Sequence, residues 1–379
     1  MSRQAYPAAH AVAPRLHAYF AHRHQESSLR GQPDLASVPD TTTIERLIDA
    51  AFWASLRREE GYIPRISLAF LSPQQALSPL TFERPLPLIP ATLTRVSPAV
   101  ERSGIHLGVW SEENQFGVWG TTRAIPTLCF VLEVAAPGVL VVKHHTGEEL
   151  GKYVNVAVLE GDQVKIVDEH GSNVARYPAA LTFPRALGSP TSTVHSVNIL
   201  IQLAVSMRAH GRGGSLLVVP AGSESWRESI VWPMPYIVSP PYSELARLSR
   251  ENPNDAGRQT WKDALGRTVD AIAGLTAVDG AVLLTDQHEL LGFGAKIARR
   301  RGWAQVEQVT VTEPIDGAVA TLVHPEELGG TRHLSAAQFV QDQRDAVAFV
   351  ASQDGRFTIF EWSAHESMVH AHRVEVLLL

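Results

Sequence analysis

Two short motifs, about fifty residues apart, constrain what the second half of this chain can fold into. Asp279-Gly280-Ala281 precedes an apolar run, and Leu328-Gly329-Gly330-Thr331-Arg332-His333 stands where a turn gives way to a helical pattern. The first motif predicts a strand start that carries a carboxylate. The second predicts a helix start where free backbone N–H groups, a hydroxyl, a guanidinium and an imidazole surround one point. Such a set suits an anionic oxygen.

The two motifs also offer complementary chemistry if they meet in space. The Asp279 carboxylate can hold Mg²⁺ or Mn²⁺ against the phosphate that the helix start binds. Each motif alone is more typical of a plain structural role, because Gly329-Gly330-Thr331 also fits a turn with a helix cap and Asp279-Gly280 also fits a turn into a strand. Their order, with strands between and after them, favours a shared site.

This order resembles the diadenylate cyclase (DAC) domain over about residues 268–360. In that family an Asp-Gly-Ala at a strand start is followed by a hairpin, then by Gly-Thr-Arg-His-Arg opening a helix, and then by a strand ending in a Ser-Glu-Glu-like turn. Two elements depart from the family pattern: Leu334 replaces the second arginine, and the turn reads Ser352-Gln353-Asp354. The chain is therefore more similar to the degenerate DAC-like sensor domains, especially the variant called DACNV, than to a working cyclase.

The resemblance implies a set of site residues. It gives Asp279 the metal and ribose role, and it would make Asp279 the catalytic residue if the site were active. It gives phosphate binding to the helix start and places Ser352 and Asp354 at the rim that completes the metal site. The implied nucleotide-binding residues are Asp279, Gly280, Ala281, Gly330, Thr331, Arg332, His333 and Ser352, and the implied metal ligands are Asp279 and Asp354.

Three functions are weighed on this basis. The favoured function is a sensor that binds an adenine nucleotide or a cyclic dinucleotide. An arginine contact to phosphate contributes about 1.5–3 kcal/mol, and Leu334 cannot make it. Its loss weakens the stabilisation that turnover of a triphosphate needs, while binding through the remaining residues is still expected. The alternatives are an active diadenylate cyclase that makes cyclic di-AMP from two ATP, and a structural or interaction scaffold. In the family two nucleotides face each other across a homodimer, so we expect a homo-oligomer or an effector protein as partner.

Composition sets limits on the class of protein. The 379 residues have room for two or three domains, and the net charge of −6 gives no reason to expect nucleic-acid or anionic-membrane binding. No stretch reaches the roughly 18 apolar residues that a membrane span needs. The single cysteine, Cys129, lies in an apolar run and is expected to be a buried thiol in a reducing compartment. We expect a soluble, cytoplasmic, bacterial protein.

The fold class expected is α/β, with a mixed sheet flanked by helices in each half. Residues 1–43 are predicted to be a flexible arm and linker, since Pro7 and Pro14 interrupt an amphipathic helix. Residues 44–175 are predicted to form a helix on a mostly antiparallel sheet, and residues 191–379 a DAC-like nucleotide-binding domain. The halves also suggest a degenerate repeat, in which Ser103 stands where Asp279 has its counterpart.

Three further patterns are assigned ordinary structural roles. Gly292-Phe293-Gly294-Ala295-Lys296 lacks the P-loop order and is predicted to be a hairpin strand. The basic run Arg299-Arg300-Arg301 is more typical of a solvated turn than of a phosphate contact. The pairs His144-His145 and His370, His372 are predicted to be surface histidines rather than metal ligands.

Overall fold

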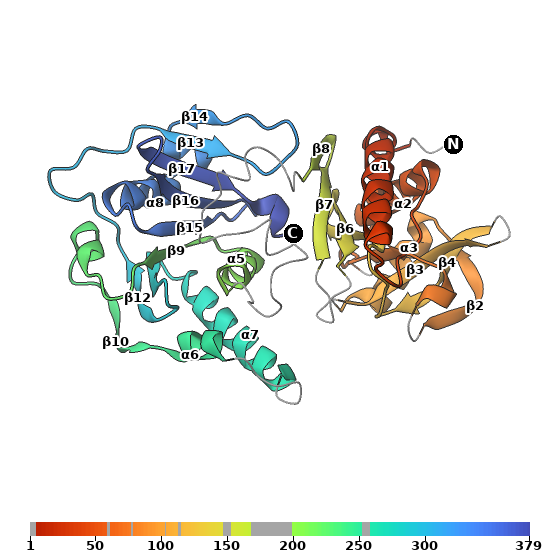
Figure 1. Ribbon diagram of the computed structural model, residues 1–379, viewed down its shortest axis with the longest axis horizontal. Coiled ribbons are helices and arrows are strands. Elements are labelled where there is room, and N and C mark those ends of the chain that lie inside the picture. Colours follow the sequence, from red (N-terminus) through yellow and green to blue (C-terminus); the bar gives the residue numbers. More distant parts are fainter. Residues whose placement is uncertain are drawn as a thin grey trace. The chain divides into compact units, whose positions relative to one another are not determined.

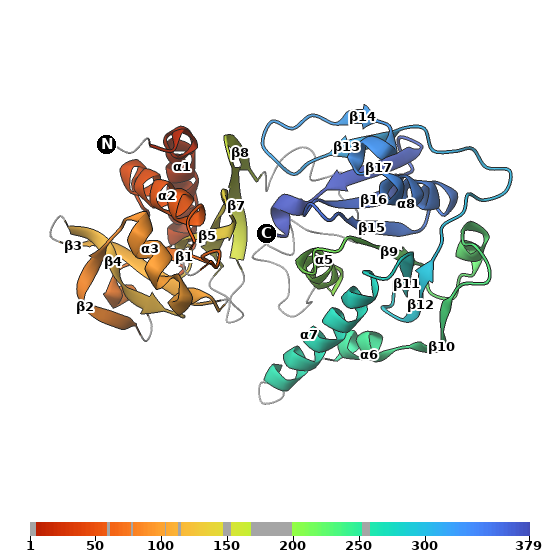
Figure 2. The same ribbon diagram turned by 180° about the vertical axis from the view of Figure 1, so that it is seen from behind.

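The computed structural model describes residues 5–58, 61–76, 79–102, 104–112, 115–146, 153–167, 199–251 and 258–379. The chain divides into two compact units, Met1–Asp168 with Leu379, and Glu169–Leu378 (Figures 1 and 2). Each unit has its own sheet and its own core. None of the described helices combines the length and the apolar character that a bilayer crossing requires.

The first unit carries an eight-stranded sheet with the order β2-β4-β3-β1-β5-β6-β7-β8. Strands β1 and β3 are parallel and the other neighbours are antiparallel, as the predicted mostly antiparallel sheet requires. Its elements are α1 (Pro7–Leu29), α2 (Thr41–Ser55), β1 (Ser67–Phe70), η1 (Pro73–Gln75), β2 (Leu80–Pro87), α3 (Pro90–Val96), η2 (Ser97–Val100), β3 (His106–Glu112), β4 (Gln115–Thr122), β5 (Phe130–Ala136), β6 (Val139–His145), β7 (Tyr153–Glu160) and β8 (Gln163–Ile166).

The prediction of a flexible arm before residue 43 is wrong, because Pro7–Leu29 forms helix α1. Pro7 begins the helix, where a missing N–H costs nothing, and Pro14 lies inside it. The helix is held by the apolar face that includes Leu16 and Phe20, which are fully buried in the first core with α2. Tertiary packing therefore outweighs the penalty of one proline in the helix.

The second unit carries a nine-stranded sheet with the order β10-β12-β11-β9-β15-β16-β17-β13-β14. Strand pair β9/β11 is parallel, like β1/β3. Its elements are α5 (Ile199–Ala209), β9 (Gly214–Val219), η4 (Ser225–Ser229), β10 (Tyr236–Tyr242), α6 (Glu244–Arg250), α7 (Arg258–Leu275), β11 (Ala281–Thr285), β12 (Leu290–Ala295), β13 (Val309–Thr312), β14 (Thr321–Val323), η5 (Pro325–Leu328), α8 (Thr331–Asp342), β15 (Val347–Ala351), β16 (Phe357–Ser363), β17 (Met368–Arg373) and η6 (Glu375–Leu377).

Helices cover both faces of the second sheet. On one face α5 and α7 pack on side chains such as Leu216, Val282 and Ile359. On the other face α8 packs on Leu217, Val350 and their neighbours, and it lies over β15 and β16 in Figures 1 and 2. Alternate residues of β9 point to opposite faces, which is why this strand is buried along its whole length.

The two sheets repeat one strand order. The series β2-β4-β3-β1-β5-β6-β7 corresponds, strand by strand, to β10-β12-β11-β9-β15-β16-β17, with the same parallel central pair. The main difference lies between the hairpin and the next strand, where the second unit inserts β13, β14 and α8 and the first unit passes directly from β4 to β5. Mixed sheets flanked by helices are thus present in both halves, as the sequence predicted. Ser103 and the interval between the two predicted domains, residues 176–190, lie outside the described residues.

Candidate functional site

The two sequence motifs meet at one edge of the second sheet. Strands β9 and β11 start there in parallel, with Ser215 opposite Ala281, and the antiparallel β15 ends there, with Ala351 opposite Gly214. The first turn of α8 reaches the same edge, because a Cβ atom at Gly213 would lie 3.1 Å from the Arg332 Nη1 atom. Three segments therefore meet at this edge: the glycine loop of residues 211–214, the turn at Asp279 and the start of α8.

Asp279 is exposed and its carboxylate pairs with the Lys296 ammonium group. The hydrogen bond from Lys296 lowers the pKa of Asp279, and the charges of Lys296 and Arg332 lower it further. Lys296 reaches this position because Ala295 is paired with Ala281 across the β11/β12 hairpin. The Asp279 carboxylate thus interacts electrostatically with both Lys296 and Arg332 at this edge.

Gly280 and Ala281 shape the turn that presents Asp279. Gly280 has a φ of 106°, and a Cβ atom there would lie 2.4 Å from the Gly294 carbonyl carbon. Only glycine permits both the left-handed conformation and this close approach of the two backbones. Ala281 is buried at the start of β11, so neither side chain is available to a ligand.

The helix start divides into exposed and buried residues. Gly330, with a φ of 83°, precedes α8, and Thr331 and Arg332 are exposed. His333 is fully buried, with its ring against Gly329 and its Nε2 atom 3.3 Å from the Thr358 Oγ1 atom. Burial lowers the pKa of His333 and favours its neutral form. The expected phosphate contact from His333 does not fit this arrangement, since the ring faces the core.

The turn after β15 closes the rim of the edge. The Ser352 N–H donates to the Arg356 carbonyl at 2.9 Å, and the Gln353 side chain donates to the Arg212 carbonyl at 3.3 Å. Asp354 accepts from the Arg356 N–H at 3.2 Å and pairs with the Arg356 guanidinium at 3.4 Å. The Gln353 hydrogen bond thus connects this turn to the glycine loop, and the Asp354 carboxylate forms an ion pair within the turn itself.

The two carboxylates that the resemblance assigns to a metal ion each pair with a basic side chain. Asp279 pairs with Lys296 and Asp354 pairs with Arg356. Within the described ranges no group of three His, Cys, Asp or Glu side chains is arranged to hold a metal ion. Lys296 is the site residue that sequence reasoning missed, although hairpin pairing of residues 281 and 295 would have placed it beside Asp279.

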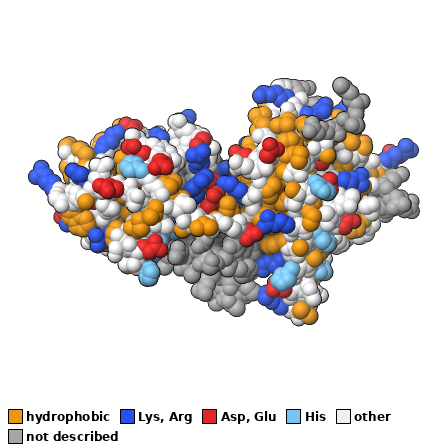
Figure 3. All heavy atoms as spheres, turned by 90° about the horizontal axis from the view of Figure 1, so that it is seen from above, with side chains coloured by type: hydrophobic (Ala, Val, Ile, Leu, Met, Phe, Trp, Pro, Cys, Tyr) orange, Lys and Arg blue, Asp and Glu red, His pale blue; other side chains and the backbone are white. Residues whose placement is uncertain are grey.

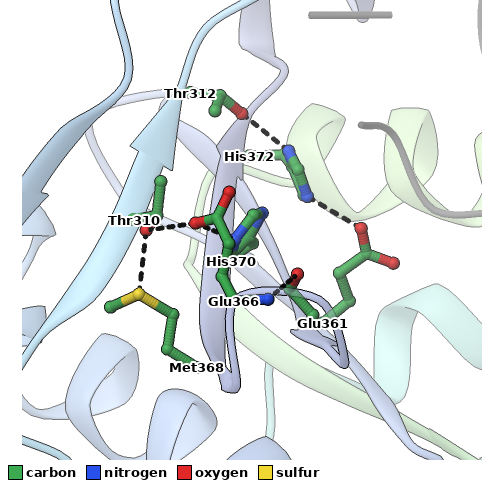
Figure 4. A network of polar contacts seen from close by, with 8 residues as sticks. Thr310, Thr312, Glu361, Glu366, Met368, His370 and His372 are labelled. Atoms are coloured by element: carbon green, nitrogen blue, oxygen red, sulfur yellow. Dashed lines mark hydrogen bonds and ion pairs between the residues drawn. The ribbon is translucent and has the colours of Figure 1, made fainter. Parts of the chain in front are cut away.

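The histidines set aside as surface residues are mostly internal. His370 and His372 are 3% and 1% exposed and lie on β17, and Figure 4 shows them within a polar network. His370 contacts Glu366 at 2.9 Å and His372 contacts Glu361 at 3.0 Å. The surface assignment is therefore wrong for this pair and also for His144, which is buried on β6. The labelled members of the network are Thr310, Thr312, Glu361, Glu366, Met368, His370 and His372.

The corresponding edge of the first unit has different chemistry. His106 starts β3 and is fully buried, with its Nδ1 atom 2.7 Å from Ser67 Oγ and its Nε2 atom 2.8 Å from the Tyr153 hydroxyl. Cys129 is buried nearby in a small apolar cluster with Trp119, as expected of a structural thiol, and burial raises its pKa. This edge carries a buried chain of hydrogen bonds from Ser67 through His106 to Tyr153.

Comparison with known proteins gives one family match in the first unit. Residues 33–123 match the model described as the probable sensor domain DACNV. No curated protein matches the chain. The matched segment contains α2, β1, β2, α3, β3 and β4, whose counterparts in the second unit are α5, β9, β10, α7, β11 and β12. The predicted similarity to DACNV-type sensor domains is thus confirmed, but over residues 33–123 of the first unit, whereas the motifs had placed it over about residues 268–360 of the second.

Proposed function

We propose that this chain is a sensor protein whose second unit binds an adenine nucleotide or a cyclic dinucleotide at the edge between Asp279 and α8. The observation that carries the proposal is the convergence of Lys296 and Arg332, two exposed cations, on the start of a twelve-residue helix beside a glycine loop. Phosphate is the group that such a set recognises best.

Each residue of this edge has a part in binding. Arg332 and the free N–H groups of the first turn of α8 bind the phosphate, with the Thr331 hydroxyl as a further donor. Lys296 turns from Asp279 to the phosphate, and the released carboxylate accepts from a sugar hydroxyl. His333 holds the turn at Gly329 in place from the interior. Binding by this route needs no metal ion, because Lys296 supplies the positive charge beside Asp279.

Leu334 makes this a binding site with weak or absent turnover. A cyclase must stabilise charge on the attacked phosphorus and on the leaving pyrophosphate. The loss of one arginine contact weakens that stabilisation by about ten- to a hundredfold. The bound state is then the signal, which a second copy of the chain or an effector protein receives.

Isothermal titration calorimetry of the full-length protein tests the proposal with AMP, ATP and cyclic di-AMP, each with and without EDTA. We expect binding that EDTA leaves unchanged, and about ten- to a hundredfold weaker binding for Arg332→Ala. Arg267→Ala, exposed on α7, is the matched control and should bind like the wild type. Absence of heat with every nucleotide would contradict the binding site. Cyclic product formed from ATP with Mn²⁺ at the rates of a working cyclase would contradict the sensor role.

A further inference from the structure

A pocket of about 360 Å³ runs along one flank of α8. A volume of this size accommodates part of a small molecule. Two apolar side chains, three neutral polar ones and one cation line the pocket, and none of them is a carboxylate. The lining residues are Ile297, Arg299, Gln305, Leu334, Ser335 and Gln338.

The pocket continues from the phosphate edge. Thr331 lies three and four residues before Leu334 and Ser335, so these side chains form one stripe along α8 that begins at the helix start. On the opposite wall, Ile297 directly follows Lys296, which pairs with Asp279. A ligand whose phosphate rests on the first turn of α8 can therefore extend along this flank.

The wall opposite α8 is fixed by side chains of the helix itself. Gln338 accepts from the Val306 N–H at 2.9 Å and donates to the Ala304 carbonyl at 3.2 Å. Asp342 accepts from the Arg300 N–H at 2.7 Å and from the Gln338 amide at 2.9 Å. These bonds hold the segment from Arg299 to Val306 at a set distance from the helix, so the pocket is built into the fold.

The three arginines of this segment differ in what they contact. Arg300 pairs with Glu228 at 2.6 Å and lies over the Trp303 ring, so its charge is already used. Arg299 lines the pocket and is exposed, and although its charge acts on Asp342, it makes no hydrogen bond or ion pair with any residue in the described part of the chain. Arg301 is equally exposed and does not line the pocket. Leu334 faces Arg299 from α8, so the cation comes from the wall and not from the helix.

We infer that Arg299 binds a second phosphate of the same ligand, which makes the site selective for nucleotides that carry two or more phosphates over nucleoside monophosphates. The inference rests on the proposed function, because the first phosphate is the one bound by Arg332 and Lys296. Ile297 and Leu334, which line the same pocket, contact the uncharged part of the ligand beside its phosphates. Arg299 thus determines specificity, while Arg332 determines binding as such.

The test compares AMP, ADP and cyclic di-AMP by calorimetry on the full-length wild type and on Arg299→Ala, Arg301→Ala and Arg332→Ala. AMP and ADP share base and sugar and differ by one phosphate, and cyclic di-AMP shows whether two phosphates in a ring serve as well as two in a chain. For Arg299→Ala we expect binding of ADP or cyclic di-AMP to weaken by about tenfold or more, and AMP binding to change by less than about twofold. Arg301→Ala should change every affinity by less than about twofold, as exposed charges away from a contact do.

The outcomes separate this inference from the function it rests on. If Arg299→Ala behaves like Arg301→Ala, or weakens AMP as much as ADP, while the wild type binds all three, Arg299 has no role in selecting the second phosphate and the inference falls alone. If the wild type binds none of the probes, the proposed function and the inference fall together. Arg299→Lys keeps the charge and should retain most of the preference for ADP over AMP, which a loss of folding would not do. The melting temperature of each variant checks that the fold is unchanged.

Discussion

His106, at the start of β3, is a fully buried imidazole between the hydroxyls of Ser67 and Tyr153. Burial lowers the pKa of His106 from 6.5 to about 4, an effect that the charge of Glu133 opposes and the charges of His145 and Lys143 assist. The neutral ring donates to one hydroxyl and accepts from the other. Protonation removes the acceptor and places a charge in the core.

The first unit should accordingly lose stability in mildly acidic solution. The unfolded chain binds a proton at His106 below about pH 6.5 and the folded chain only below about pH 4, so the stabilisation is complete above 6.5 and falls by about 3 kcal/mol as the pH drops to 4. Urea unfolding followed by tryptophan fluorescence at pH 7, 5.5 and 4 measures this loss. His106→Asn removes the titrating group, so its stability should change with pH by a smaller amount. Identical pH profiles for the two proteins would refute the assignment.

At the level of single residues, the sequence predicted the proximity of two exposed residues and missed the burial of a third. Asp279 and Arg332 approach each other as their motifs required. His333 was assigned to phosphate because of its neighbours, yet it shares one helical face with Ala336, Ala337 and Val340, all of them buried. That spacing indicates a core position. Lys296 needed the hairpin register, which a motif does not contain.

Among the elements, α8 contributes residues both to the proposed phosphate contact at its start and to the pocket. Asp342, its last residue, hydrogen-bonds to the segment that contains Arg299 and Arg300. Burial raises the pKa of Asp342, while the N–H of Arg300, the Gln338 amide and the nearby arginine charges oppose that rise. The carboxylate is thus the joint acceptor that holds the arginine segment against the helix. The geometry of the pocket depends on this contact.

Removal of this acceptor should loosen the pocket as well as the fold. Asp342→Ala leaves the Arg300 N–H and the Gln338 amide without their acceptor, so we expect a loss of about 1–3 kcal/mol in the free energy of unfolding. ADP binding should weaken more than AMP binding, because Arg299 is no longer held beside Leu334. Asp345→Ala, at an exposed neighbouring position, is the control for both urea unfolding and calorimetry. Equal effects of the two variants would show that the segment is held by other contacts.

Helix and strand types followed from the sequence wherever apolar spacing was regular, as in α2 and α5. The sequence did not predict secondary structure or strand pairing where tertiary contacts determine them. Helix α1 contains two prolines and is stabilised by packing of Leu16 and Phe20. The parallel pairing of β13 with β17 joins residues about sixty positions apart, and no local pattern specifies such a partner.

On the scale of the whole molecule, the chain consists of two separate cores built on one strand order. Charged side chains of both signs are mixed with apolar ones over the described parts of the face in Figure 3, in keeping with the small net charge. Each core should respond to its own substitutions.

A core substitution in the first unit tests this independence. Phe20 is 1% exposed and packs near Phe130, so Phe20→Ala should reduce the free energy of unfolding of the first unit by about 3–5 kcal/mol. Leu29, the last residue of α1, is 82% exposed, so Leu29→Ala should change this free energy by less than about 0.5 kcal/mol. Differential scanning calorimetry measures the unfolding of the first unit. Titration with a nucleotide measures the binding affinity of the second unit. A nucleotide affinity that falls with Phe20→Ala would show that the units are coupled.

The connection between the hairpin and the fifth strand has a consequence for how such proteins diversify. In the first unit it spans residues 123–129, and in the second it spans residues 296–346 and contains Lys296, Arg299 and Arg332. The strand order is the same with or without the longer connection. On the proposed function, a change in the length of this one connection would add or remove the phosphate-binding residues and leave the strand order that carries them unchanged.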